Sequence, residues 1–360
     1  MPQFGASARS LQGRFRDTSL SISPLARAPS DDKGRRHAHL LALGHEQENL
    51  FPSLRGANGA SAFFRSRGIQ WWKSTRSGDD FTTEGPTRNL ASSQVSCLNF
   101  LLPLTHSANL TNALLGGLDA DEKTVVPVSY LREGVSLSSL IEFEWVGLST
   151  TLEGSVPQVR GANVTSADAL LLADLTAGGR RAYLLEWKYV EEYKSGDYLG
   201  RGRGGTTRRR RYSGRYTSPS SPFRSDVPLD EWFYEPFYQI MRLLLLGQKM
   251  VDEREQGVTE ATVVVVCPQE NTAYRDRITS PALEARFPRA TSVIEAVEGS
   301  IRDPARFRVT SQDALLRLIA SSQSAVLHDW LTYHRERYGW VGGTANGPTP
   351  DWNSVAGRKQ

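Results

Sequence analysis

Residues 182–190 read AYLLEWKYV, the pattern of a buried β-strand that also carries an acid and an amine. Side chains two positions apart on a strand project from the same face, so Glu186 and Lys188 lie together while the apolar side chains around them fill the other face. Burying a carboxylate beside an ammonium costs desolvation energy, so such a pair needs a reason to be kept. A divalent cation held next to a phosphate group would use both charges.

A second apolar run lies upstream at residues 164–175, which read VTSADALLLADL, and the turn signal AGGR at 177–180 separates the two runs. This pattern predicts a β-hairpin. A turn centred on its two glycines puts Asp168 opposite position 189, within reach of the acid and the amine of the other strand. It puts Asp174 close to the turn and away from them. Asp168 is therefore the predicted partner.

An aspartate on one strand, followed by Glu-x-Lys on the next, resembles the PD-(D/E)xK nuclease superfamily over residues 85–270. The resemblance implies an α/β fold with a restriction-endonuclease-like αβββαβ core, in which helices flank a mixed central sheet. It also implies an endonuclease that hydrolyses phosphodiester bonds, with DNA as the favoured substrate. Asp168 and Glu186 would hold Mg²⁺ or Mn²⁺, and Lys188 would assist the attacking water.

The family's first core helix, which in many members contributes a glutamate, corresponds to residues 89–104. A serine cap, apolar spacing and a terminal proline predict this helix. It offers amides such as Gln94 where the family has an acid. The alternating strand at 140–148 carries Glu142 and Glu144, either of which could supply the missing carboxylate, and Glu144 is our candidate third metal ligand. The alternative is that both are solvent-facing strand residues.

The periodicity of residues 230–250 predicts the clearest helix of the chain. Gln239 on this helix resembles a glutamine that approaches the active site in several branches of the superfamily, and Arg242 lies three residues further on. An unbroken β-branched run at 262–267 predicts the last core strand, covered on both faces. A short strand and two helices beyond it, up to Tyr338, would close the domain.

Arginines crowd into the segment 195–226, whereas the formal charge of the whole chain is only +4. A local basic character suits contact with a polyanion. We expect this segment to be a flexible flap that neutralises phosphates, and the alternative is a disordered insertion without a dedicated role. A Gly-x-Gly-x-x-Gly match within it does not follow a strand and open a helix, which excludes a dinucleotide site. The candidate nucleic-acid-binding residues are Arg201, Arg203, Arg208, Arg209, Arg210, Arg211 and Arg242.

The length of 360 residues allows one elaborated domain, which we expect at 41–342, after a disordered tail at 1–40 and before a loose tail at 343–360. The only two cysteines predict reduced core thiols and a cytoplasmic protein. No run approaches the ~18 apolar residues of a membrane span, so we expect no membrane contact. We expect nucleic acid as the partner and leave a homodimer open.

Two other interpretations compete with a nuclease. The absence of an acid on the first helix favours a catalytically inactive, nuclease-like module that binds nucleic acid through its arginines. Alternatively, Glu186 and Lys188 form an ordinary strand ion pair, worth up to about 1 kcal/mol at a surface, on an unrelated α/β domain. Salt-sensitive binding without cleavage would mark the first alternative.

Overall fold

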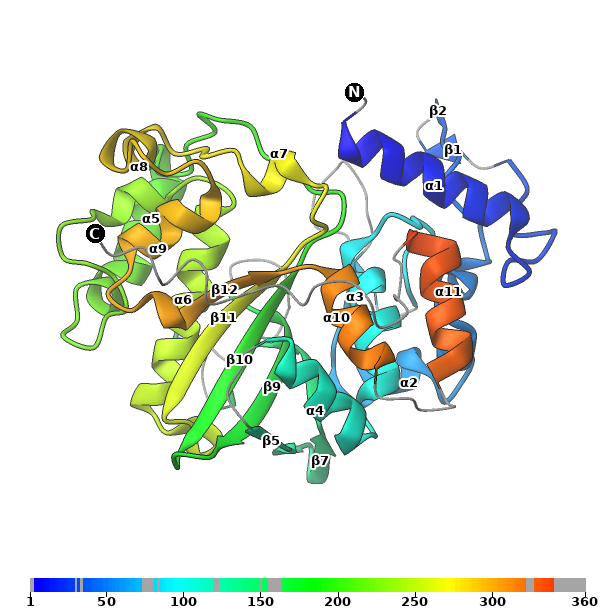
Figure 1. The fold of residues 1–360 in the computed structure, drawn as a ribbon, viewed down its shortest axis with the longest axis horizontal. Coiled ribbons are helices and arrows are strands. Elements are labelled where there is room, and N and C mark those ends of the chain that lie inside the picture. Colours follow the sequence, from blue (N-terminus) through cyan, green and yellow to red (C-terminus); the bar gives the residue numbers. More distant parts are fainter. Residues whose placement is uncertain are drawn as a thin grey trace.

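A computed structural model describes residues 3–29, 31–32, 35–72, 81–82, 85–118, 123–148, 151–154, 164–321 and 327–339. Its centre is a mixed six-stranded sheet with helices on both faces (Figure 1). The sheet order is β12-β11-β10-β9-β5, and β8 also pairs with β9. The strands are β5 Lys123–Val126, β8 Ile141–Trp145, β9 Ala167–Leu175, β10 Arg180–Trp187, β11 Glu260–Val266 and β12 Phe307–Thr310.

Strand β9 is shared along its length by two partners. Its first half pairs with β8 and its second half with β5, both antiparallel. On its other side β9 pairs antiparallel with β10, and β10, β11 and β12 are parallel. With α3 (Ser93–Leu101) before β8 and α6 (Phe237–Asp252) between β10 and β11, the chain order confirms the predicted αβββαβ core.

The predicted register of the β9–β10 hairpin is wrong by three residues. Arg180 pairs with Asp174, to which it also forms an ion pair of 2.8 Å. The turn is a three-residue loop in which the Leu175 amide donates to the Gly179 carbonyl at 3.0 Å, and Gly178 and Gly179 adopt φ of 90° and 88°, a conformation that favours glycine. The corrected register, continued by one residue, sets Asp168 directly opposite Glu186, on the same face of the sheet.

The even-numbered side chains of β9 and β10, among them Leu170 and Leu184, pack against α6 and form one of the two cores. The helix approaches the sheet closely because Gly247 has no side chain: a Cβ there would lie 2.9 Å from the Cβ of Ala261. The same core contains the aromatic side chains of α5 (Gly202–Tyr216) and residues of α8 (Pro281–Arg286) and α9 (Val293–Ser300).

The odd-numbered side chains, such as Tyr183 and Trp187, pack into a second core on the other face. Here Phe100 of α3 meets the Trp187 ring at 5.1 Å between centroids. The elements around this core are α1 (Phe4–Thr18), α2 (Ala60–Arg67), α4 (Ala108–Gly116), α10 (Gln312–Ala320) and α11 (His328–Tyr338).

The prediction of a disordered tail at residues 1–40 is wrong, because α1 is a helix packed on α11 (Figure 1). The buried side chain of Gln12 donates to the Tyr189 hydroxyl and to the Arg337 carbonyl, both at 2.8 Å. Phe15 is buried beneath the guanidinium of Arg337. These partners lie far along the sequence, so local composition alone gives a polar segment that looks unstructured. The C-terminal tail predicted at 343–360 falls outside the described residues.

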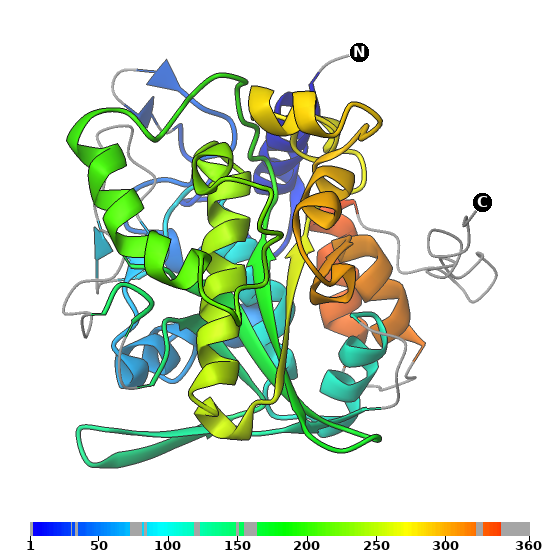
Figure 2. The same cartoon turned by 90° about the vertical axis from the view of Figure 1, so that its left-hand side faces the viewer.

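The remaining elements are peripheral. The hairpin of β6 (Val128–Arg132) and β7 (Val135–Ser139) projects past the sheet at the bottom of Figure 2. The small pairs are β1 (Asp31–Asp32) with β2 (Arg35–Arg36) and β3 (Trp71–Trp72) with β4 (Phe81–Thr82), and a short helix α7 (Thr272–Arg275) follows β11. Single 3₁₀ turns span Glu46–Asn49, Pro52–Leu54, Leu102–Leu104, Leu229–Trp232, Glu255–Gly257 and Pro304–Arg306. Within the described ranges, every helix is too short or too polar to cross a membrane.

Candidate active site

The polar side chains predicted from the two strands meet at one end of the sheet. Asp168 is the second residue of β9, Glu186 the penultimate residue of β10, and Lys188 follows directly after β10. The register places all three on the face of the sheet that α6 covers. The hairpin therefore gathers two acids and one amine at a single point, as the sequence predicts, although through a different pairing.

Lys188 is the centre of the flank of the site that faces α6. Its Nζ lies 2.5 Å from Glu186 Oε1 and donates to Gln239 Oε1 at 2.6 Å, and the Lys188 and Glu186 side chains are both buried. Burial alone would lower the pKa of Lys188, but Glu186, together with the smaller effects of nearby tyrosines and of a second glutamate, outweighs it and holds that pKa well above its usual value. Lys188 is therefore a fixed positive charge, and Gln239 on α6 helps to aim it.

Asp168 has the opposite electrostatic environment. Its Oδ2 accepts a hydrogen bond of 2.6 Å from the Trp187 amide, which fixes the carboxyl beside β10. Burial and the nearby carboxylates of Glu186 and Glu144 raise its pKa well above the usual range, against the opposing effects of Lys188 and of the Trp187 amide. The ionised form of Asp168 is therefore disfavoured by its burial and by the acids beside it.

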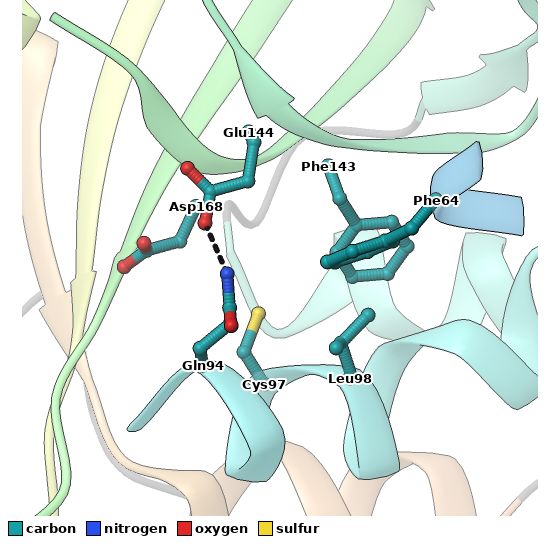
Figure 3. A pocket seen from close by; sticks show the side chains of 7 residues that line it. All are labelled: Phe64, Gln94, Cys97, Leu98, Phe143, Glu144 and Asp168. Atoms are coloured by element: carbon teal, nitrogen blue, oxygen red, sulfur yellow. Dashed lines mark hydrogen bonds between the residues drawn. The ribbon is translucent and has the colours of Figure 1, made fainter. Parts of the chain in front are cut away.

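Glu144 reaches the site from β8 with an unusual backbone. The pairing of β8 with β9 sets it level with Asp168, and its φ of 49° lies in the left-handed region, where a residue with a side chain costs roughly 1–2 kcal/mol. Its carboxylate accepts from Gln94 Nε2 at 2.8 Å and from Ser166 Oγ at 3.1 Å. Figure 3 shows Glu144 and Asp168 side by side, with Gln94 reaching them from α3 and apolar residues closing the other end of the hollow.

The alternative acid of β8, Glu142, is used elsewhere. Both of its oxygens accept from the guanidinium of Arg67, at 2.6 and 2.8 Å, and both side chains are buried. A bidentate pair of this kind satisfies the carboxylate. Glu142 therefore anchors α2 to the sheet, which leaves Glu144 as the acid of β8 that faces the site. The expectation that both acids of this strand face solvent is wrong, since both are buried.

The donor set of the site is that of a hard divalent cation, which prefers carboxylate oxygens. The acids beside Asp168 fit such an ion. In the structure the carboxylates instead engage protein donors, and no three acidic, histidine or cysteine side chains of the described residues gather closely enough to hold a metal. The residue types therefore fit Mg²⁺ or Mn²⁺, while binding requires Glu186 and Asp168 to turn toward a common point.

Arg242 lies one turn beyond Gln239 on α6 but does not join the Glu186–Lys188 pair. Its guanidinium carbon lies 4.9 Å from the centroid of the Tyr238 ring, and its buried Nε has no hydrogen-bond partner within the described part of the chain. The neighbouring acid Glu235 also leaves one buried oxygen without such a partner, and burial raises its pKa. Residues 235–242 thus border the site with polar atoms that remain free to bind.

The segment 195–226, predicted as a flexible flap, contains the ordered helix α5, so that expectation is wrong. Tyr212 and Tyr216, four residues apart, bury one face of the helix, and the Tyr216 hydroxyl donates to the Val227 carbonyl at 2.7 Å. Tyr212 donates to Glu153, which also accepts from Thr165 ahead of β9. The helix is therefore tied to the loop that leads into Asp168.

The arginines of this segment divide into two groups. Arg208 donates to the Leu199 carbonyl at 2.8 Å, and Arg209 forms an ion pair of 2.8 Å with Asp230. These two hold α5 in place, with Arg211 partly buried beside them. Among the candidate nucleic-acid-binding arginines of this segment, the exposed ones are Arg201, Arg203 and Arg210.

Two tyrosines next to Lys188 were not identified from the sequence. The Tyr193 hydroxyl lies 3.5 Å from Gln239 Oε1, and its ring meets that of Tyr274, which is buried, at 5.9 Å between centroids. The Tyr274 hydroxyl has no hydrogen-bond partner among the described residues. Tyrosines in a loop and in a one-turn helix give no periodic signal, so only the fold brings them to the site.

Comparison with known proteins gives one match. Residues 70–339 match the model of the family described as Restriction Endonuclease associating with ARP, which covers most of the chain and all of the site residues described above. Searches of curated proteins and of solved structures gave no match.

Proposed function

The chain belongs to the family Restriction Endonuclease associating with ARP, and from this premise we propose that it is a metal-dependent nuclease that cleaves DNA. Membership indicates a nuclease-like function. The observation that carries the finer proposal is the meeting of Asp168, Glu186 and Lys188 on one face at the end of the β9–β10 hairpin, where two acids and a fixed positive charge share one place.

Asp168 and Glu186 are the residues that would hold Mg²⁺ or Mn²⁺. When bound, the ion supplies positive charge that acidifies a water and offsets the charge of the phosphate. Without it, burial and the neighbouring carboxylates of Glu186 and Glu144 disfavour the charged form of Asp168 and raise its pKa. A cation at this place offsets that cost, so the arrangement favours binding.

Lys188 acts as a charge rather than as a base in this proposal. Because Glu186 keeps its pKa high, its ammonium stays protonated and has hydrogens to donate. Gln239 accepts one of them and so orients the group. Glu186 takes a second hydrogen, and the third is available to a phosphate oxygen or to the attacking water, where a preoriented donor stabilises charge that develops in the transition state.

The exposed arginines of α5 supply the contact with the sugar–phosphate backbone. Arg203 and Arg210 lie seven residues apart, so they share one face of the helix, opposite the buried tyrosines. Arginines of this kind bind phosphates without reading sequence. Since α5 is ordered, it offers these charges in a fixed position beside the loop that enters β9.

Incubating the purified chain with Mg²⁺ or Mn²⁺ and supercoiled, linear and single-stranded DNA, with RNA in parallel, tests the proposal. We expect cleavage of DNA, and a loss of about 100-fold or more in Glu186→Gln and Lys188→Met. Asp174→Asn is the matched control, because it removes an acid of β9 whose partner, Arg180, is at the surface. Substrates left intact under every condition, or a Glu186→Gln variant as active as the native chain, would refute the proposal.

A second candidate is a nuclease-like module that binds nucleic acid without cutting it. The observation in its favour is that Asp168, Glu186 and Glu144 each engage protein donors in this structure. The two candidates separate in one assay. Salt-sensitive DNA binding, lost in Arg203→Ala with Arg210→Ala but unchanged in Asp168→Asn, together with no cleavage, would favour the binding module.

A further inference from the structure

The first core helix delivers an amide to the place where the acids meet. Gln94 lies in the first turn of α3, which is capped by the Ser92 side chain on the Val95 amide. The buried Gln94 side chain points at β8 and donates to Glu144 at 2.8 Å (Figure 3). A glutamine carries no charge and cannot replace an acid, but it can hold one.

Glu144 is held from two sides and by its own backbone. Besides Gln94 of α3, Ser166 donates to it from the residues that enter β9, only two positions before Asp168. The left-handed φ of Glu144 interrupts the regular course of β8 at this single residue. Strained backbone of this kind persists where the surrounding structure enforces it, and it is concentrated at functional sites.

The charge of Glu144 reaches the rest of the site. Gln94 and Ser166 are neutral donors, so their hydrogen bonds orient the carboxylate without cancelling its charge. The carboxylate lies beside that of Asp168 in the same hollow (Figure 3). Glu142, two residues earlier on β8, is instead neutralised by Arg67. One strand thus carries one acid that is paired with an arginine and one that Gln94 and Ser166 orient beside Asp168.

We infer that Glu144 is the third acid of the site and that Gln94 and Ser166 are its positioning residues. The acid comes from a bent position of β8, and the helix supplies the amide that aims it. This inference rests on the proposed metal-dependent nuclease and extends it, since it assigns two polar residues that hold no metal themselves.

The inference predicts that Gln94 and Glu144 work as one carboxylate and one amide in contact. Exchanging them, Gln94→Glu together with Glu144→Gln, keeps that pair and moves the acid to the helix. Each single change destroys it: Glu144→Gln leaves two amides, and Gln94→Glu leaves two carboxylates that repel each other. If the hydrogen bond between Gln94 and Glu144 were purely structural, Mn²⁺ binding would not depend on which of the two residues bears the charge.

Titration of the free protein with Mn²⁺, followed by calorimetry or by the electron paramagnetic resonance of the ion, provides a readout that needs no substrate. We expect Glu144→Gln and Gln94→Met to weaken Mn²⁺ binding by about 10-fold or more, the usual effect of losing a residue that orients a ligand. Ser166→Ala, the smallest deletion, should weaken it in the same direction, and the exchanged pair should bind more tightly than either of its single variants. Gln248→Met is the control, because it removes a bond of the same length, 2.8 Å, from Gln248 to Asp252 of α6.

The outcomes separate this inference from the proposed function. If the native chain binds Mn²⁺ and cleaves DNA while Gln94→Met and Ser166→Ala bind the ion unchanged, the inference is overturned and the nuclease stands. If the native chain neither binds Mn²⁺ nor cleaves, both fail. Should Gln94→Met not fold, as judged by circular dichroism, Ser166→Ala and Glu144→Gln decide: unchanged binding in Ser166→Ala overturns the positioning role, and unchanged binding in Glu144→Gln overturns the assignment of Glu144.

Discussion

The two flanks of the site are built on different principles. On the flank between β10 and α6, the charges of Glu186 and Lys188 neutralise each other and Gln239 completes the set. On the flank between α3 and β8, Asp168 and Glu144 stand side by side, and the donors that orient them are neutral. On the first flank, protein groups alone balance the charges and complete the hydrogen bonds of Glu186 and Lys188. In the second flank, burial and the adjacent carboxylates disfavour the charged form of Asp168, and a proton or a cation would relieve that cost. This difference is why we expect a ligand on the second flank.

The largest expected effect comes from removing the charge that satisfies the first flank. Lys188→Met leaves Glu186 buried without its cation, which typically lowers the free energy of unfolding by 3–5 kcal/mol. Chemical denaturation measures this loss. Lys249→Met is the matched control: the Lys249 ammonium is also buried and pairs at 2.6 Å, but its acid, Glu253, is 38 % exposed and can return to water. Equal losses in both variants would show that the first flank is no more self-contained than a peripheral pair.

A divalent cation should stabilise the chain through the second flank. At a Mg²⁺ concentration of 100 times its Kd, binding adds about 2.7 kcal/mol to the free energy of unfolding. Thermal denaturation with and without Mg²⁺ would show a rise in Tm for the native chain and little or none for Asp168→Asn. Asp174→Asn should respond like the native chain. An equal rise in all three would indicate a non-specific effect of the salt.

Asp168→Asn should also stabilise the chain when no metal is present. Because the pKa of Asp168 is raised in the folded chain, the folded state binds more protons than the unfolded state above pH ~4. The free energy of unfolding contributed by this group therefore falls as the pH rises through that window. The asparagine variant lacks this loss, so we expect it to be more stable than the native chain at pH 7.

Denaturation curves of both proteins between pH 4 and pH 8 measure the difference, which should shrink as the pH falls. A variant that is less stable than the native chain at neutral pH would show that the Trp187 amide, which donates to Asp168, outweighs the neighbouring carboxylates. The charged form of Asp168 would then be stabilised by its protein partners, as Glu186 and Lys188 are on the first flank.

Much of the first flank could be predicted from the sequence. Two apolar runs separated by a glycine turn identified β9 and β10, alternation placed Glu186 and Lys188 on one face, and helical spacing identified α6 with Gln239. The register was wrong because it depends on the loop type: with Gly178 and Gly179 both at positive φ, the turn closes over three residues. Since a shift by an odd number changes the face that a strand residue occupies, a local turn decides whether Asp168 faces Glu186.

The two acids of the second flank were candidates from the sequence, but the contacts that place them could not be predicted because they are tertiary. The pairing of Gln94 with Glu144 needs a left-handed backbone at Glu144 of β8. Glutamate has no preference for that conformation, so the sequence does not predict it. Helices α1 and α5 were not predicted from the sequence for the same reason. Each looks polar in sequence, and each is held by distant partners, such as Arg337 for Gln12 and Glu153 for Tyr212.

The smallest expected effects concern α5, where the comparison of the flanks extends to the substrate. If the second flank receives a cation and a phosphate, the exposed Arg203 and Arg210 should add backbone contacts without affecting stability. Each change to alanine should lower the slope of log K against log salt for DNA binding by about 1, with a shift in the free energy of unfolding within about 0.5 kcal/mol.

Arg209→Ala is the informative contrast, because Arg209 already donates to Asp230 and Tyr198 within the protein. It should loosen α5, seen as faster amide hydrogen exchange over the helix, while the salt slope stays near that of the native chain. A slope that falls equally in all three variants would mean that the fixed and the exposed arginines are not distinct, and that α5 leaves its place when DNA binds.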